Sequence, residues 1–107
     1  MNSSRLNQLL KFLQEDPNDP FTIYALATEY KTHDASKSRM YFEKLLKDHP
    51  DYLPTYYHVA QLYMALGLKQ QAEESFLKGI DLAKTQNNSL ALRELQNAYN
   101  EFLFDDE

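Results

Sequence analysis

The feature that most constrains this chain is an internal repeat. The first half of each copy has a bulky residue, an apolar–small pair that begins three positions later, and a tyrosine three positions after the small residue. The second half has a small residue followed four positions later by a phenylalanine. The copies lie 33 residues apart at Leu26 and Val59, and 34 apart at Phe42 and Phe76. A supersecondary unit of this length cannot bury its apolar face alone, so neighbouring copies must stack. The first copy comprises Ile23, Leu26, Ala27, Tyr30, Ser38 and Phe42, and the second Tyr56, Val59, Ala60, Tyr63, Ala72 and Phe76.

The apolar spacing within and around the repeat is helical. Leu6, Leu9, Leu10 and Leu13 fall at i, i+3, i+4 and i+7, which marks one face of a helix. Prolines and glycines interrupt such faces, and Gly67 suits a helix C-terminus because glycine tolerates a positive φ. At the start of the last helix, we expect the Ser89 hydroxyl to act as the N-cap. The sequence predicts six helices, at about residues 3–15, 21–32, 35–48, 53–66, 69–84 and 89–103.

The small residues of the repeat indicate close helix packing. Ala27 and Ala60 have short side chains, so a partner helix can approach at Ser38 and Ala72. Gly79 takes the small position in the last helix of the second copy. The aromatic residues then fill the space between successive helix pairs.

This pattern resembles the tetratricopeptide repeat (TPR). The resemblance implies an all-α fold, a right-handed TPR-like α-solenoid of about six antiparallel helices, with two full repeats and half-repeat caps. We expect residues 1–107 to form a single domain. The first helix resembles the second half of an earlier repeat, and the sixth resembles the first half of a later one.

Composition excludes several kinds of chemistry. The chain has no cysteine, and no two of its three histidines are spaced to form a metal pair on a helix. Only two glycines are present, which cannot build a phosphate-binding loop. We therefore expect no catalytic residues, no metal and no cofactor, and we expect that the protein is not an enzyme.

The net charge of −5 predicts no binding to nucleic acid, because an acidic chain repels phosphates. No apolar stretch approaches the length of a membrane span, so we expect no membrane partner. The N-terminus lacks the pattern of a signal peptide. These features predict a cytoplasmic protein.

The TPR resemblance implies a concave side lined by the second, fourth and sixth helices. The fourth helix carries no Asp, Glu, Lys or Arg, which favours contact on several sides. The resemblance places these residues in a peptide-binding groove: Phe21, Tyr24, Thr28, Lys31, Tyr57, Gln61, Met64, Arg93 and Asn97.

Some TPR proteins bind a carboxylate with a Lys–Asn clamp on these helices. In this chain the corresponding pairs are Tyr24/Thr28 and Tyr57/Gln61, and only Arg93/Asn97 approaches the clamp. Aromatic and methionine side chains nevertheless suit polypeptide recognition. The hypothesis is therefore an adaptor that binds a protein or peptide partner. Alternatively, Tyr24 and Tyr57 stack on each other or on the sixth helix and leave no groove.

A second hypothesis is self-association through the terminal helices. These helices are rich in apolar residues for two chain ends, and such faces can pair with a second copy. We therefore expect either a monomer or a weak homodimer. The residues concerned are Leu6, Leu9, Leu10, Phe102, Leu103 and Phe104.

Overall fold

The computed structural model describes residues 3–105, which contain six helices and no strand. The prediction of an all-α fold with about six helices is confirmed, and the helix bounds differ from the expected ones by at most two residues. The chain divides into two compact units, one ending at Thr55 and the other beginning at Tyr56. That the whole chain is a single domain stays a prediction. The helices are α1 (Ser3–Glu15), α2 (Pro20–Tyr30), α3 (Ala35–Asp48), α4 (Pro54–Ala65), α5 (Lys69–Thr85) and α6 (Ser89–Asp105).

Aspartate side chains cap the first two helices that follow α1. Asp19 Oδ2 accepts hydrogen bonds from the Thr22 backbone N–H (3.3 Å) and from the Thr22 hydroxyl (2.6 Å). Pro20 follows as the first residue of α2, where its missing N–H costs nothing. In the same way, Asp34 Oδ1 accepts from the Lys37 N–H (3.1 Å) at the start of α3. These caps fix where each helix begins.

The prediction that Gly67 caps the end of α4 is confirmed. Gly67 has a φ of 75°, and the Leu68 N–H donates to the Tyr63 carbonyl (2.8 Å). The Gly67 N–H donates to the Met64 carbonyl (3.0 Å). This pair of bonds is a Schellman motif, which satisfies carbonyls that the helix end leaves unpaired.

The end of α5 uses the same motif without glycine. Asn87 has a φ of 55°, and the Asn88 N–H donates to the Ala83 carbonyl (2.9 Å). The Asn88 side chain then accepts from the Ala91 N–H (3.0 Å) and caps α6. The prediction that Ser89 is this cap is wrong, because Ser89 is already the first residue of the helix. The Schellman turn places the asparagine at the capping position instead.

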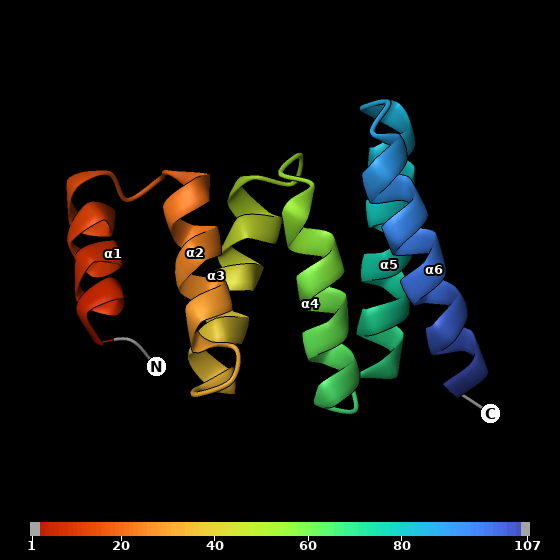
Figure 1. Cartoon of the computed structure of the whole chain (residues 1–107), viewed down its shortest axis with the longest axis horizontal. Coiled ribbons are helices and arrows are strands. Elements are labelled where there is room, and N and C mark those ends of the chain that lie inside the picture. Colours follow the sequence, from red (N-terminus) through yellow and green to blue (C-terminus); the bar gives the residue numbers. More distant parts are fainter. Residues whose placement is uncertain (1–2, 106–107) are drawn as a thin grey trace. The chain divides into compact units, whose positions relative to one another are not determined.

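In the first unit, α1, α2 and α3 alternate in direction (Figure 1). A core of Leu9, Ala25, Leu26 and Tyr30 joins α1 to α2, and the remaining leucines of the α1 stripe pack around it. The α2–α3 pair is fastened by the Ser38 hydroxyl, which donates to the Ala27 carbonyl (2.7 Å). The expected close approach of these two small residues is therefore present in the structure.

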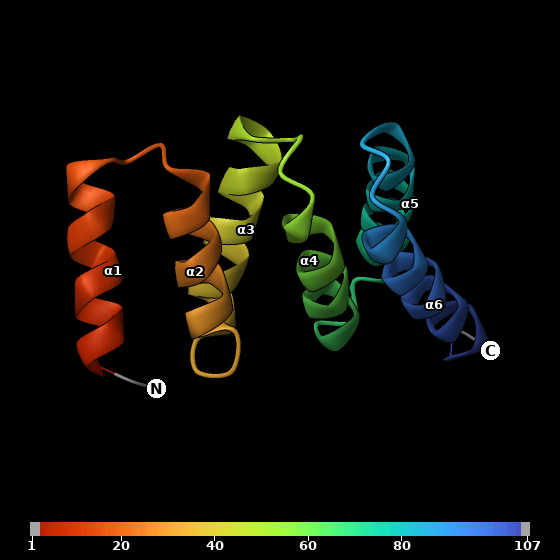
Figure 2. The same ribbon diagram turned by 45° about the horizontal axis from the view of Figure 1, so that its top comes forward.

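In the second unit, which contains α4 from Tyr56 onward, the helices α4, α5 and α6 also alternate in direction (Figure 2). The Phe76 ring lies 5.7 Å from that of Phe102, measured between centroids, so these rings join α5 to α6. Gly79 is the point of closest approach. A Cβ added there would lie 2.7 Å from Tyr56 Cβ and 3.2 Å from a methyl carbon of Leu95. The structure therefore leaves no room for a side chain at this position.

Candidate functional site

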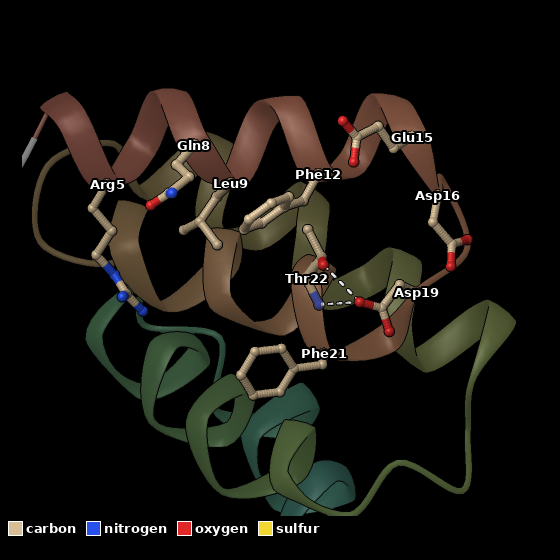
Figure 3. A pocket seen from close by; sticks show the side chains of 9 residues that line it. All are labelled: Arg5, Gln8, Leu9, Phe12, Glu15, Asp16, Asp19, Phe21 and Thr22. Atoms are coloured by element: carbon tan, nitrogen blue, oxygen red, sulfur yellow. Dashed lines mark hydrogen bonds between the residues drawn. The ribbon is translucent and has the colours of Figure 1, made fainter.

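A pocket of about 440 Å³ opens between α1 and the start of α2 (Figure 3). Its volume lies in the range of about 300–1,000 Å³ that is usual for ligand pockets. We call it the α1–α2 pocket. Its lining contains an apolar part, formed by Leu9, Phe12 and Phe21, and an acidic part, formed by Glu15, Asp16 and Asp19. All of these residues belong to the first compact unit.

The apolar part of the α1–α2 pocket leaves two aromatic rings open to solvent. Leu9 is buried in the α1–α2 core, whereas Phe12 is 45% exposed and Phe21 is 64% exposed. Phe21 is followed by Thr22 and Ile23, both of which are buried, so the exposed ring stands on a firmly packed segment. Large exposed aromatic side chains on a rigid support are typical of contact surfaces.

The acidic part of the pocket gathers at the turn that joins α1 to α2 (Figure 3). The Asn18 N–H donates to Asp16 Oδ1 (3.3 Å), so the turn positions this carboxylate. The Thr22 hydroxyl, which donates to Asp19, holds the pKa of that carboxyl below its usual value. Hydrogen bonds from the turn and from the start of α2 therefore hold these two carboxylates in place.

Arg5 lines the opposite end of the pocket (Figure 3). Its Nε lies 3.2 Å from Oε2 of Glu29 on α2, so its positive charge is offset within the protein. The lining consequently carries three carboxylates and one arginine that is already ion-paired. The net effect is a negative pocket.

The residues expected in the groove from α2 differ in their availability. Phe21 is exposed, while the Tyr24 ring packs against that of Tyr52 with centroids 5.7 Å apart. Burial raises the pKa of the Tyr24 phenol, with a smaller contribution from Tyr52. The Thr28 hydroxyl donates to the Ala25 carbonyl (3.0 Å), and burial lowers the pKa of the half-buried Lys31. Phe21 is therefore the most accessible side chain of this set.

The expected groove residues of the second unit are half-buried or exposed. Tyr57, Gln61 and Met64 on α4 are half-buried, and Arg93 and Asn97 on α6 are exposed. The Tyr57 ring meets the neighbouring His58 ring edge-on, with centroids 5.4 Å apart. Met64 also lines a smaller pocket of about 150 Å³ together with Lys69, Phe102 and Asp105. That these residues and those of α2 line one groove stays a prediction.

The sequence pattern did not indicate the α1–α2 pocket as a whole, although one of its lining residues, Phe21, was predicted to lie in a binding groove. The repeat pattern indicated only that the first helix is a half-repeat cap with a leucine stripe. A signal was nevertheless present, because Phe12 falls outside the stripe of Leu6, Leu9, Leu10 and Leu13. An aromatic residue off the packed face of a helix is left exposed unless another element covers it.

The described residues show no group of three or more His, Cys, Asp or Glu side chains placed to hold a metal ion. Among the helices of residues 3–105, none has the length and apolarity required to cross a membrane.

Comparison with solved structures shows two structures, one from solution and one from a crystal, of the same similar protein. The solution structure of a tetratricopeptide repeat domain protein from Salinibacter ruber is 42% identical to this chain, with a TM-score of 0.76, over 81% of this chain and 89% of that chain. The crystal structure of the same Salinibacter ruber domain is 41% identical, with a TM-score of 0.74, over 78% of this chain and 94% of that one.

A third structure shows the fold alone. The solution structure of a protein from Bordetella parapertussis matches 99% of this chain and 92% of that chain, with a TM-score of 0.82 at 16% identity. No family model matches the chain. No curated protein matches it either.

Proposed function

Because the chain belongs to the tetratricopeptide repeat family, we propose that it is a non-catalytic module that binds a segment of another protein. Repeats of this family generally serve protein–protein interaction. The proposed binding surface is the concave face expected from α2, α4 and α6. Location in the cytoplasm stays a prediction.

The observation that carries this proposal is the exposure of Phe21. This ring is 64% exposed although the two residues that follow it are buried. Exposed aromatic side chains lose little conformational entropy on binding and supply a large contact area. Tyr57, half-buried on α4, offers a second aromatic contact of the same kind.

The proposal is tested by selecting peptides from a random library on the immobilised protein. Affinities of the selected peptides are then measured by fluorescence anisotropy. We expect Phe21→Ala and Tyr57→Ala each to weaken binding by about 1–3 kcal/mol, as for modest hot spots. The exposed residue Lys84 on α5 offers a control, and Lys84→Ala should bind like the wild type.

Two results would contradict the proposed surface. One is a library that yields no binder. The other is a set of binders whose affinities are unchanged in both aromatic variants. Thermal melts of every variant are required, because a loss of binding counts only where the fold is retained.

A second candidate function is self-association through the C-terminal end of α6. Phe104 is 75% exposed and Leu103 is 43% exposed, so both present apolar surface to solvent. The expected set of terminal apolar residues is narrowed, because Leu9 and Phe102 are buried in the structure and cannot be offered to a second copy. Leu6 and Leu10 pack against the core of the first unit.

Light scattering across a wide range of concentrations separates these functions. Self-association predicts a mass that rises with concentration in the wild type and remains that of a monomer in Phe104→Ser. A monomer at every concentration would remove this candidate.

A further inference from the structure

We propose that the α1–α2 pocket receives an apolar side chain from a basic segment of the partner, whose lysine or arginine residues pair with the acidic turn. This inference rests on the proposed function, since it specifies the chemistry of the bound segment. It also extends the binding surface to α1, which the predicted groove of α2, α4 and α6 does not include.

Phe12 and Phe21 are the reason why we propose that the bound segment supplies an apolar side chain. Both rings line the pocket and are exposed, and the buried Leu9 lies between α1 and α2 beside them (Figure 3). An aliphatic or aromatic side chain placed here would cover these rings and remove apolar surface from water. The volume of about 440 Å³ leaves room for such a side chain together with its neighbours.

The charges at the pocket are the reason why we propose that the bound segment is basic. Glu15, Asp16 and Asp19 lie on one side, and the ion pair with Glu29 offsets the charge of Arg5. An acidic peptide would meet three carboxylates, whereas a cationic one gains attraction. A lysine or arginine near the exposed rings also gains from the cation–π interaction.

Charge also argues against a second copy of this chain as the occupant. The chain carries a net charge of −5, so a second copy is repelled by an acidic pocket unless it presents a basic patch. Complementarity therefore favours a basic partner segment.

The experiment uses short synthetic peptides labelled with fluorescein. The first carries leucine and phenylalanine flanked by lysines, the second has glutamates in place of the lysines, and the third keeps the lysines but has serines in place of the apolar residues. We expect the wild-type protein to bind the first peptide most tightly, by tenfold or more in Kd, which corresponds to about 1.4 kcal/mol. Added salt should weaken that binding.

Two protein variants test the pocket, one for its apolar part and one for its acidic part. Phe12→Ala should weaken binding of the first peptide several-fold, because it removes a lining ring that the fold leaves exposed. Glu15→Lys/Asp16→Lys should reverse the preference, so that the glutamate peptide binds more tightly than the lysine peptide. Asp19 is left intact because it caps α2. The matched control is Lys47→Glu, a charge reversal at an exposed position on α3.

Failure of this inference is distinguishable from failure of the proposed function. If peptides selected from the library lose affinity in Tyr57→Ala but bind Phe12→Ala and Glu15→Lys/Asp16→Lys like the wild type, the protein binds peptides elsewhere and the inference is overturned. If no peptide binds at all, both are overturned. A wild type that dimerises where Phe12→Ala is a monomer would show that a second copy occupies the pocket, and this also overturns the inference.

Discussion

At the scale of single residues, Gly79 decides how closely α5 packs in the second unit. Helix propensity alone predicts that Gly79→Ala stabilises the protein by up to about 1 kcal/mol. Packing predicts the opposite, because the added Cβ would lie 2.7 Å from Tyr56 Cβ. Tyr56 Cβ is attached to the backbone and cannot rotate away.

We therefore expect Gly79→Ala to lower the free energy of unfolding by about 1–3 kcal/mol, as overpacking usually does. Urea denaturation measures this change. Lys78→Ala, at the exposed position just before it, should have a small effect. Stabilisation by Gly79→Ala would show that α5 can shift away from Tyr56 at little cost.

Among residues 3–105, Asn87 is the one non-glycine residue with a positive φ, at 55°. A left-handed conformation costs a residue with a Cβ about 1–2 kcal/mol, although asparagine tolerates it better than most. We expect Asn87→Gly to raise the melting temperature, with a gain in stability of at most about 1 kcal/mol.

The reciprocal change supplies the control. Gly67 has a φ of 75°, and a Cβ added there would meet no atom within 4 Å. Gly67→Ala should therefore destabilise the protein through backbone strain alone. If Asn87→Gly and Gly67→Ala shift the melting temperature in the same direction, backbone strain at the ends of α4 and α5 does not determine the effect of these substitutions.

At the scale of elements, the α2–α3 pair depends on a small residue at position 38. The Ser38 hydroxyl donates to the Ala27 carbonyl in a buried site. The second repeat carries Ala72 at the equivalent place, so small volume is the shared requirement. We expect Ser38→Ala to cost about 1 kcal/mol, the usual net contribution of a hydrogen bond.

Ser38→Leu should cost more than Ser38→Ala, since it forces the two helices apart. Chemical denaturation of both variants measures the difference. Ser36→Ala, at an exposed position in the first turn of α3, provides the control. Equal stability of Ser38→Ala and Ser38→Leu would contradict the close approach of the two helices.

Asp19, at the N-terminus of α2, makes a pH-dependent contribution to the stability of the fold. Its folded-state pKa lies below the ordinary value of 3.8, chiefly because the Thr22 hydroxyl donates to the carboxylate. A lowered pKa contributes stability that is present above the unfolded-state pKa and is lost as the pH falls through the folded-state value.

We therefore expect Asp19→Asn to melt at a lower temperature than the wild type at neutral pH. The difference should shrink as the pH falls from about 4 through the lower folded-state pKa, because the wild-type carboxyl is then protonated. Thermal melts across the acidic range measure it. A difference that remains constant at every pH would mean that the charge on Asp19 does not stabilise α2.

At the scale of the whole molecule, net charge governs which polymers approach. The chain carries 16 acidic and 11 basic residues and a net charge of −5. Binding to DNA or RNA draws on lysines and arginines that neutralise phosphates. We expect no retardation of either nucleic acid in gel-shift experiments at physiological salt. Binding that weakens steeply with salt would contradict this and would indicate a basic surface.

The sequence by itself determined the helices and the pairing of small residues. The repeat constrains the packing closely, because neighbouring helices can stack only where the small residues Ala27 and Ser38 come together. Gly67 could be assigned because only a residue that tolerates positive φ ends a helix in this way. The same reasoning failed at Ser89, because the conformation of Asn87 places Asn88 at the cap.

The tertiary structure alone decided which aromatic side chains remain available. Tyr24 and Phe21 lie three residues apart on α2, yet Tyr24 packs against Tyr52 and Phe21 is exposed. The α1–α2 pocket also appears only when the turn brings Asp16 and Asp19 beside Phe12. Local periodicity describes one helix at a time, whereas exposure and charge at a pocket depend on which elements the fold brings together.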